Sequence, residues 1–83
     1  MANIKDKITN AEIGRHYKLY RKVISEEEKW EFHNKHATHL VYIETFIGER
    51  RWRHTPVAIE PHELKYTVKG MINEIVKQYN KEL

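Results

Sequence analysis

The stretch that decides the fold runs from residue 39 to residue 59 and reads HLVYIETFIGERRWRHTPVAI. Two runs rich in β-branched and aromatic residues, His39–Ile47 and Arg50–Ile59, flank the dipeptide Gly48-Glu49. Glycine at the first central position suits a two-residue type II′ turn, whose twist matches that of the flanking strands. The stretch therefore predicts an antiparallel β-hairpin that turns at Gly48-Glu49.

A two-residue turn also fixes which residues of the hairpin lie opposite each other. The predicted pairs are Ile47 with Arg50, Thr45 with Trp52 and Ile43 with His54 on one face, and Phe46 with Arg51, Glu44 with Arg53 and Leu40 with Val57 on the other. The Glu44–Arg53 pair joins opposite charges, which supports this register. Pro56 lacks an N–H, so we expect the second strand to lie at a sheet edge there.

Upstream of the hairpin, the sequence predicts a helix that begins near Thr9. Thr9 and Glu12 form a capping-box pattern. Apolar residues then recur at helical spacing up to Ile24, and these are Ile13, Tyr17, Tyr20 and Ile24. The opposite side of such a helix would be basic and would carry Arg15, Lys18 and Lys22.

Residues 25–38 support two interpretations. Ser25 and Glu28 form a second capping-box pattern, which predicts a short second helix. Residues 29–33 instead alternate with period two, which predicts a strand followed by a turn; the first helix would then run on to about residue 27. We favour the strand, because Trp30 and Phe32 are hard to place together on one face of a helix.

The last element is predicted to be a long helix from Pro61 to residue 82. Proline suits the first helical position, where no N–H is needed. A broad apolar stripe follows, made of Leu64, Val68, Met71, Ile72, Ile75, Val76, Tyr79 and Leu83. At 1.5 Å per residue the helix would be about 30 Å long, more than the small sheet requires. We therefore expect part of the stripe to be available for a homodimer through this helix.

Together these elements predict one small α+β domain over residues 1–83, with a mobile segment at 1–8. It would contain an N-terminal helix, a small antiparallel β-meander of two or three strands, and a long C-terminal helix. The element order is similar to that of double-stranded RNA-binding domains, which grip phosphates with a lysine cluster at the start of their final helix. Residues 60–65 read EPHELK and lack that cluster, so we do not assign the chain to that family.

Composition excludes several classes of function. The chain has no cysteine, which excludes disulfides, thiolate zinc sites and a cysteine nucleophile. Its apolar runs are short, as in Leu40–Ile43, which predicts a cytoplasmic protein with no membrane association. Ser25 is the only serine and is followed by three glutamates, and the three glycines are isolated, so neither a serine nucleophile nor a phosphate loop is indicated. We therefore expect neither enzymatic activity nor a cofactor.

Histidines form the one group that suggests a metal site. His33, His36 and His39 are spaced so that two of them could meet on a helix. Zinc needs three or four ligands, however, and no second ligand pair stands at a defined distance. We therefore predict no metal.

Charge is segregated along the chain, although the net charge is only +3. Residues 1–24 hold six Lys and Arg against two acidic residues, residues 25–49 hold two against six, and residues 50–60 hold three against one. Arginine binds phosphate in a bidentate manner, and Trp and Arg planes stack on bases. The leading hypothesis is therefore a binding module for an anionic partner, nucleic acid or nucleotide, with a predicted site of Arg15, Lys18, Lys22, Arg50, Arg51, Trp52 and Arg53. It requires these cations to converge on one surface.

The alternative hypothesis is a small inhibitor or adaptor that docks on a host protein, of the kind that phages and other mobile genetic elements encode. Its basis is the acidic segment between basic flanks, the several large aromatic residues and the surplus apolar stripe of the last helix. Exposed Trp, Tyr and Arg are the usual anchors of such interfaces.

Overall fold

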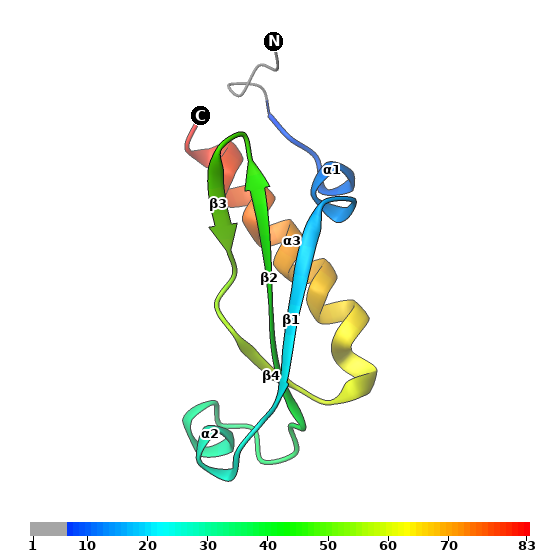
Figure 1. Ribbon diagram of the computed structural model, residues 1–83, viewed down its shortest axis with the longest axis vertical. Coiled ribbons are helices and arrows are strands. Elements are labelled where there is room, and N and C mark those ends of the chain that lie inside the picture. Colours follow the sequence, from blue (N-terminus) through cyan, green and yellow to red (C-terminus); the bar gives the residue numbers. More distant parts are fainter. Residues whose placement is uncertain (1–6) are drawn as a thin grey trace.

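The computed structural model describes residues 7–83; Met1 to Asp6, and with them most of the segment predicted to be mobile, lie outside the described residues. The fold is α+β, as predicted, with a four-stranded antiparallel sheet and a long helix along one of its faces (Figure 1). In chain order the elements are α1 (Asn10–Gly14), β1 (Tyr17–Val23), α2 (Glu26–Glu31), β2 (His39–Ile47), β3 (Arg50–Arg53), β4 (Val57–Ile59), the 3-10 turn η1 (Pro61–Glu63) and α3 (Leu64–Lys81). Within residues 7–83, no helix is both long and apolar enough to cross a membrane.

The hairpin between β2 and β3 is confirmed in position and in register. Ile47 lies opposite Arg50, Thr45 opposite Trp52, and Glu44 opposite Arg53. Gly48 has a φ of 65°. Glu49 has a negative φ, since His33 is the only described non-glycine residue with a positive φ. A type I′ turn needs positive φ at both central residues, so these angles agree with the type II′ turn.

The predicted second strand of the hairpin is interrupted. His54 still donates its N–H to the carbonyl oxygen of Ile43 at 3.1 Å. Beyond it, Val57 lies opposite Val41, so the predicted pairing of Val57 with Leu40 was wrong by one residue. Pro56 cannot donate to a ladder, and the segment around it leaves the sheet. One additional residue is accommodated there, and the strand resumes as β4.

The helix predicted from Thr9 exists, but it ends far earlier than the apolar spacing indicated. Its capping box forms, with the Glu12 N–H donating to Thr9 Oγ1 at 3.3 Å and the Thr9 N–H donating to Glu12 Oε1 at 3.2 Å. The helix stops at Gly14, and residues 17–23 are the strand β1, paired with β2 along its whole length. The prediction of a basic helix face was therefore wrong. Tyrosine and valine favour strands, and long-range pairing with β2 decided between the two periodicities.

Residues 25–38 adopt the interpretation that we did not favour. Ser25 caps α2 through a complete capping box with Glu28, and no strand forms at residues 29–33. Trp30 and Phe32 do not have to share one helical face, because α2 does not bury Trp30, which remains 82% exposed.

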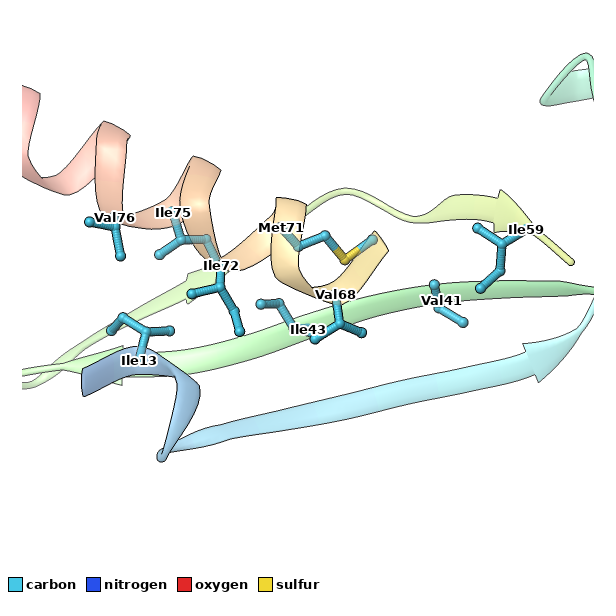
Figure 2. Packing of buried hydrophobic residues seen from close by; sticks show 9 residues of the cluster. All are labelled: Ile13, Val41, Ile43, Ile59, Val68, Met71, Ile72, Ile75 and Val76. Carbon is cyan, nitrogen blue, oxygen red and sulfur yellow. The ribbon is translucent and has the colours of Figure 1, made fainter. Parts of the chain in front are cut away.

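The long helix α3 covers one face of the sheet and forms the core with it, as Figure 2 shows. The main buried cluster joins both layers and consists of Ile13, Val41, Ile43, Ile59, Val68, Met71, Ile72, Ile75 and Val76. A second small cluster of Ile24, Ala37, Leu40 and Ala58 holds the end of the sheet near α2. Of the predicted helical stripe, only Leu83 is exposed. Because the sheet of the same chain already covers this stripe, the stripe gives no support to a homodimer through α3.

Candidate anion-binding face of the sheet

The sheet face opposite α3 carries a set of basic and aromatic side chains that we call the open face. Side chains of a strand alternate between the two faces, and residues paired across an antiparallel ladder share a face. The register of β1, β2 and β3 therefore places the following residues on the open face: Lys18, Tyr20, Lys22, Tyr42, Glu44, Phe46, Arg51 and Arg53. Lys18, Glu44 and Arg53 form one row across the three strands.

Glu44 lies at the centre of the open face, beneath two arginines. Its Oε2 accepts from Arg53 Nη2 at 3.2 Å and lies 3.5 Å from Arg51 Nη1. The Tyr20 hydroxyl donates to Oε1 of the same carboxylate at 3.5 Å. The Glu44 side chain is 12% exposed, whereas those of Arg51 and Arg53 are 57% and 52% exposed. One carboxylate thus orients two guanidinium groups and offsets only one of their charges.

Two tyrosines stack beside this cluster. The ring centroids of Tyr20 and Tyr42 lie 4.8 Å apart, with an interplanar angle of 13°. Lys18 Nζ lies 5.2 Å from the centroid of the Tyr20 ring, and Arg53 Cζ lies 5.6 Å from that of Tyr42. Both separations are within the range of cation–π attraction. The aromatic pair therefore contacts one cation on β1 and one on β3.

The fourth cation of the open face is partly neutralised by α2. Lys22 Nζ lies 2.8 Å from Glu28 Oε2. The hydrogen bond from Lys22, with that from the Ser25 backbone N–H, lowers the pKa of Glu28 to about 2. Four cations stand against Glu28 and Glu44 here, which leaves a net charge of +2 on the open face.

Two of the predicted site residues, Arg50 and Trp52, lie on the opposite face, toward α3. The Trp52 ring packs on the core and meets Tyr79 edge to face, with centroids 5.9 Å apart. Arg50 Cζ lies 4.2 Å from the indole centroid, and Arg50 Nη1 pairs with Glu82 Oε1 at 2.8 Å. Arg50 and Tyr79 thus both contact the indole, and Glu82 offsets the Arg50 charge. Trp52 therefore belongs to the scaffold and lies away from the open face.

The remaining predicted residue, Arg15, lies at the C-cap of α1, before β1 begins. Of the seven predicted site residues, the structure thus brings together Lys18, Lys22, Arg51 and Arg53. Sequence reasoning missed Tyr20, Tyr42 and Glu44, because a helical interpretation assigned Tyr20 to the core. The alternation of Lys18, Tyr20 and Lys22 was the signal that could have placed them on one strand face.

A hollow of about 270 Å³ beside the tyrosine pair is lined by Tyr20, Arg21, Lys22, Leu40, Tyr42 and Pro56. His33, His36 and His39 do not converge; in the described part of the chain, the one group of three potential ligands within 4.8 Å of one another is Glu60, His62 and Glu63. Glu63 already accepts the Glu60 N–H at 2.9 Å as part of a helix cap.

Comparison with models of protein families, with curated proteins and with solved structures finds no match for this chain.

Proposed function

We propose that this protein is a non-enzymatic binding module that recognises an anionic partner, a nucleic acid or nucleotide, on the open face. The observation that carries the proposal is that Lys18, Lys22, Arg51 and Arg53, from two strands that flank β2, share one sheet face that α3 leaves uncovered. Their excess positive charge would attract phosphate.

Ion pairing with Glu44 leaves hydrogen-bonding capacity on both arginines. A guanidinium has five N–H donors. Glu44 engages Nε and Nη2 of Arg53 and approaches Nη1 of Arg51. The other donors of these half-exposed side chains remain available to phosphate oxygens, and the carboxylate restricts the rotamers that the arginines adopt.

Aromatic side chains on the same face would add contacts to bases. Phe46 is 61% exposed and stands next to Arg51 in the hairpin register. Bases stack on exposed aromatic rings in many single-strand binding sites, with little dependence on base identity. Phosphate contacts with some stacking would give affinity with modest sequence preference.

The test is fluorescence anisotropy of a labelled short oligothymidine, titrated with protein at several salt concentrations. The dissociation constant should rise steeply with salt. The Arg51→Ala/Arg53→Ala variant should lower the slope of log K against log salt by about 1.4, because each phosphate contact on a single strand contributes about 0.7. Lys69→Ala/Lys77→Ala on α3 removes the same charge from another surface and serves as the control. Absence of binding at low salt, or an equal loss in the control, would overturn the proposal. Displacement by ATP at millimolar concentration would indicate the nucleotide version.

A second candidate function, docking on a host protein as an inhibitor or adaptor, has one specific observation in its favour. Trp30 is 82% exposed on a helix whose first turn carries three glutamates. Isolated tryptophans of this kind anchor protein interfaces. A partner that is retained from lysate after nuclease treatment, and is lost with Trp30→Ala, would favour this function over the first.

A further inference from the structure

The strand β1 forms an outer edge of the sheet. It pairs with β2 through seven consecutive residues, and no strand within residues 7–83 pairs with its other edge (Figure 1). The seven residues include no proline. A long, regular edge of this kind is a template for a further strand, and natural proteins usually block it.

The hairpin determines which backbone groups of β1 face that edge. The carbonyl of Ile43 accepts from His54 and therefore faces β3. The N–H and C=O groups of successive residues point to opposite sides of a strand. The backbone groups of the even-numbered residues of β2 therefore face β1, where the register pairs them with the backbone groups of Lys18, Tyr20 and Lys22. The N–H and C=O groups of the odd-numbered residues of β1 point to the free edge.

The side chains of those odd-numbered residues lie on the α3 side of the sheet, but α3 does not cover them. Tyr17 is 38% exposed, Leu19 36% and Val23 75%. They form an apolar shelf along the free edge, interrupted by the exposed Arg21. A strand added there would bury this shelf and satisfy the backbone groups together.

The charge of β1 determines what kind of strand would fit. Lys18 and Arg21 form no ion pair with any described residue, and Lys22 has one partner, Glu28. A second copy paired antiparallel over the whole strand would put Lys18 opposite Lys22 twice, and like charges directly opposite are destabilising. Acidic residues at the same positions would instead be attracted.

We propose that the free edge of β1 accepts an extended acidic segment of another protein as an additional antiparallel strand. Its apolar residues would lie opposite Tyr17, Leu19 and Val23, and its acidic residues opposite Lys18, Arg21 and Lys22. Main-chain hydrogen bonds would supply affinity, and the charge pattern would supply specificity. The proposal does not rest on nucleic-acid binding, although Lys18 and Lys22 belong to both surfaces.

The register defines the probe, a capped peptide of sequence Val-Glu-Glu-Thr-Val-Glu-Val. Calorimetry and amide chemical-shift mapping on the full chain should detect its binding, with shifts concentrated in β1. A peptide with lysine in place of glutamate should bind at least about tenfold more weakly, because three cross-strand charge pairs become repulsive. A peptide methylated on the backbone amides that face β1 keeps every side chain. Its affinity should also fall about tenfold, because these amides can no longer donate hydrogen bonds to β1.

Two protein variants complete the test. Leu19→Pro removes an N–H that faces the free edge and no bond to β2, so it should fold and bind the peptide about tenfold more weakly. Leu19→Thr keeps the donor and is the matched control, and thermal unfolding checks that both variants fold. Equal binding of the methylated peptide, binding mapped away from β1, or no binding at all would overturn the proposal. A dimer mass in light scattering, with amide shifts that place the contact on β1, would also overturn the proposal, because a second copy would then occupy the edge. Oligothymidine titrations on the same variants keep this outcome separate from that of the open face.

Discussion

Arg50 lies over Trp52, with its Cζ 4.2 Å from the indole centroid, and its Nη1 pairs with Glu82 Oε1 just beyond the end of α3. The hairpin and the C-terminal end of the helix are therefore fastened by one stacked cation and one edge-to-face ring contact with Tyr79. This arrangement separates two neighbouring arginines by role, because Arg50 belongs to the scaffold and Arg51 to the open face.

The first prediction follows from that separation. Trp52→Ala should lower the free energy of unfolding by about 2–3 kcal/mol, somewhat less than for a fully buried tryptophan. Arg50→Ala should cost about 1 kcal/mol through the lost stacking and ion pair. Urea denaturation measures both values. Arg50→Ala should also leave oligothymidine affinity within about twofold of the original, whereas a loss as large as that of Arg51→Ala would contradict the assigned roles.

The second prediction concerns the carboxylate at the centre of the open face. Glu44→Gln keeps the shape of the side chain and removes the charge that offsets Arg51 and Arg53. Affinity for oligothymidine at low salt should rise about fivefold, since one charge at about 4 Å in a water-like dielectric is worth about 1 kcal/mol. If the arginines serve only to stabilise Glu44, the same variant would leave affinity unchanged or reduce it.

The third prediction concerns acid stability. The pKa of Glu28 is lowered from 4.5 to about 2 in the folded chain, first through Lys22 and then through the Ser25 N–H. A depressed carboxyl pKa contributes stability that is fully present above the unfolded value and is lost as pH falls through the folded value. Glu28→Gln should therefore flatten the pH dependence of unfolding between about pH 4.5 and pH 2. Denaturant titrations across this pH range measure the pH dependence of the unfolding free energy. Lys22→Met should weaken this dependence, whereas Lys18→Met should leave it unchanged.

The fourth prediction contrasts two glycines. Gly48 has a φ of 65° in the hairpin turn, so Gly48→Ala should destabilise the fold by about 1–2 kcal/mol. Gly70 lies within α3, and nothing lies within 4 Å of a Cβ placed there. Gly70→Ala should therefore stabilise the fold by about 0.8–1.0 kcal/mol. The melting temperature should fall for Gly48→Ala and rise for Gly70→Ala. A rise for Gly48→Ala would contradict the turn assignment, and a fall for Gly70→Ala would contradict the open space at that position.

The parts of the fold that local sequence determines were predictable. The Gly48-Glu49 turn, both capping boxes and the apolar stripe of α3 depend on residues within a few positions of one another. β1 was not predictable in this way, because Tyr17, Tyr20 and Ile24 fit a helical stripe as well as a strand. Only pairing with β2, more than fifteen residues further on, separates the two. The open face was not predictable for the same reason, since its tyrosine pair forms only when β1 is a strand.

The interruption around Pro56 has a consequence for which side chains are buried. In a continuous strand over residues 50–59, the residues facing α3 would all be even-numbered, as Trp52 is. The additional residue reverses this parity, so Val57 and Ile59 turn toward α3 as well, and Ile59 is 3% exposed. Two short runs with opposite phase can thus feed the same hydrophobic layer. Deleting Thr55 would remove the additional residue, and a single continuous strand would then carry Trp52, Val57 and Ile59 on the α3 face.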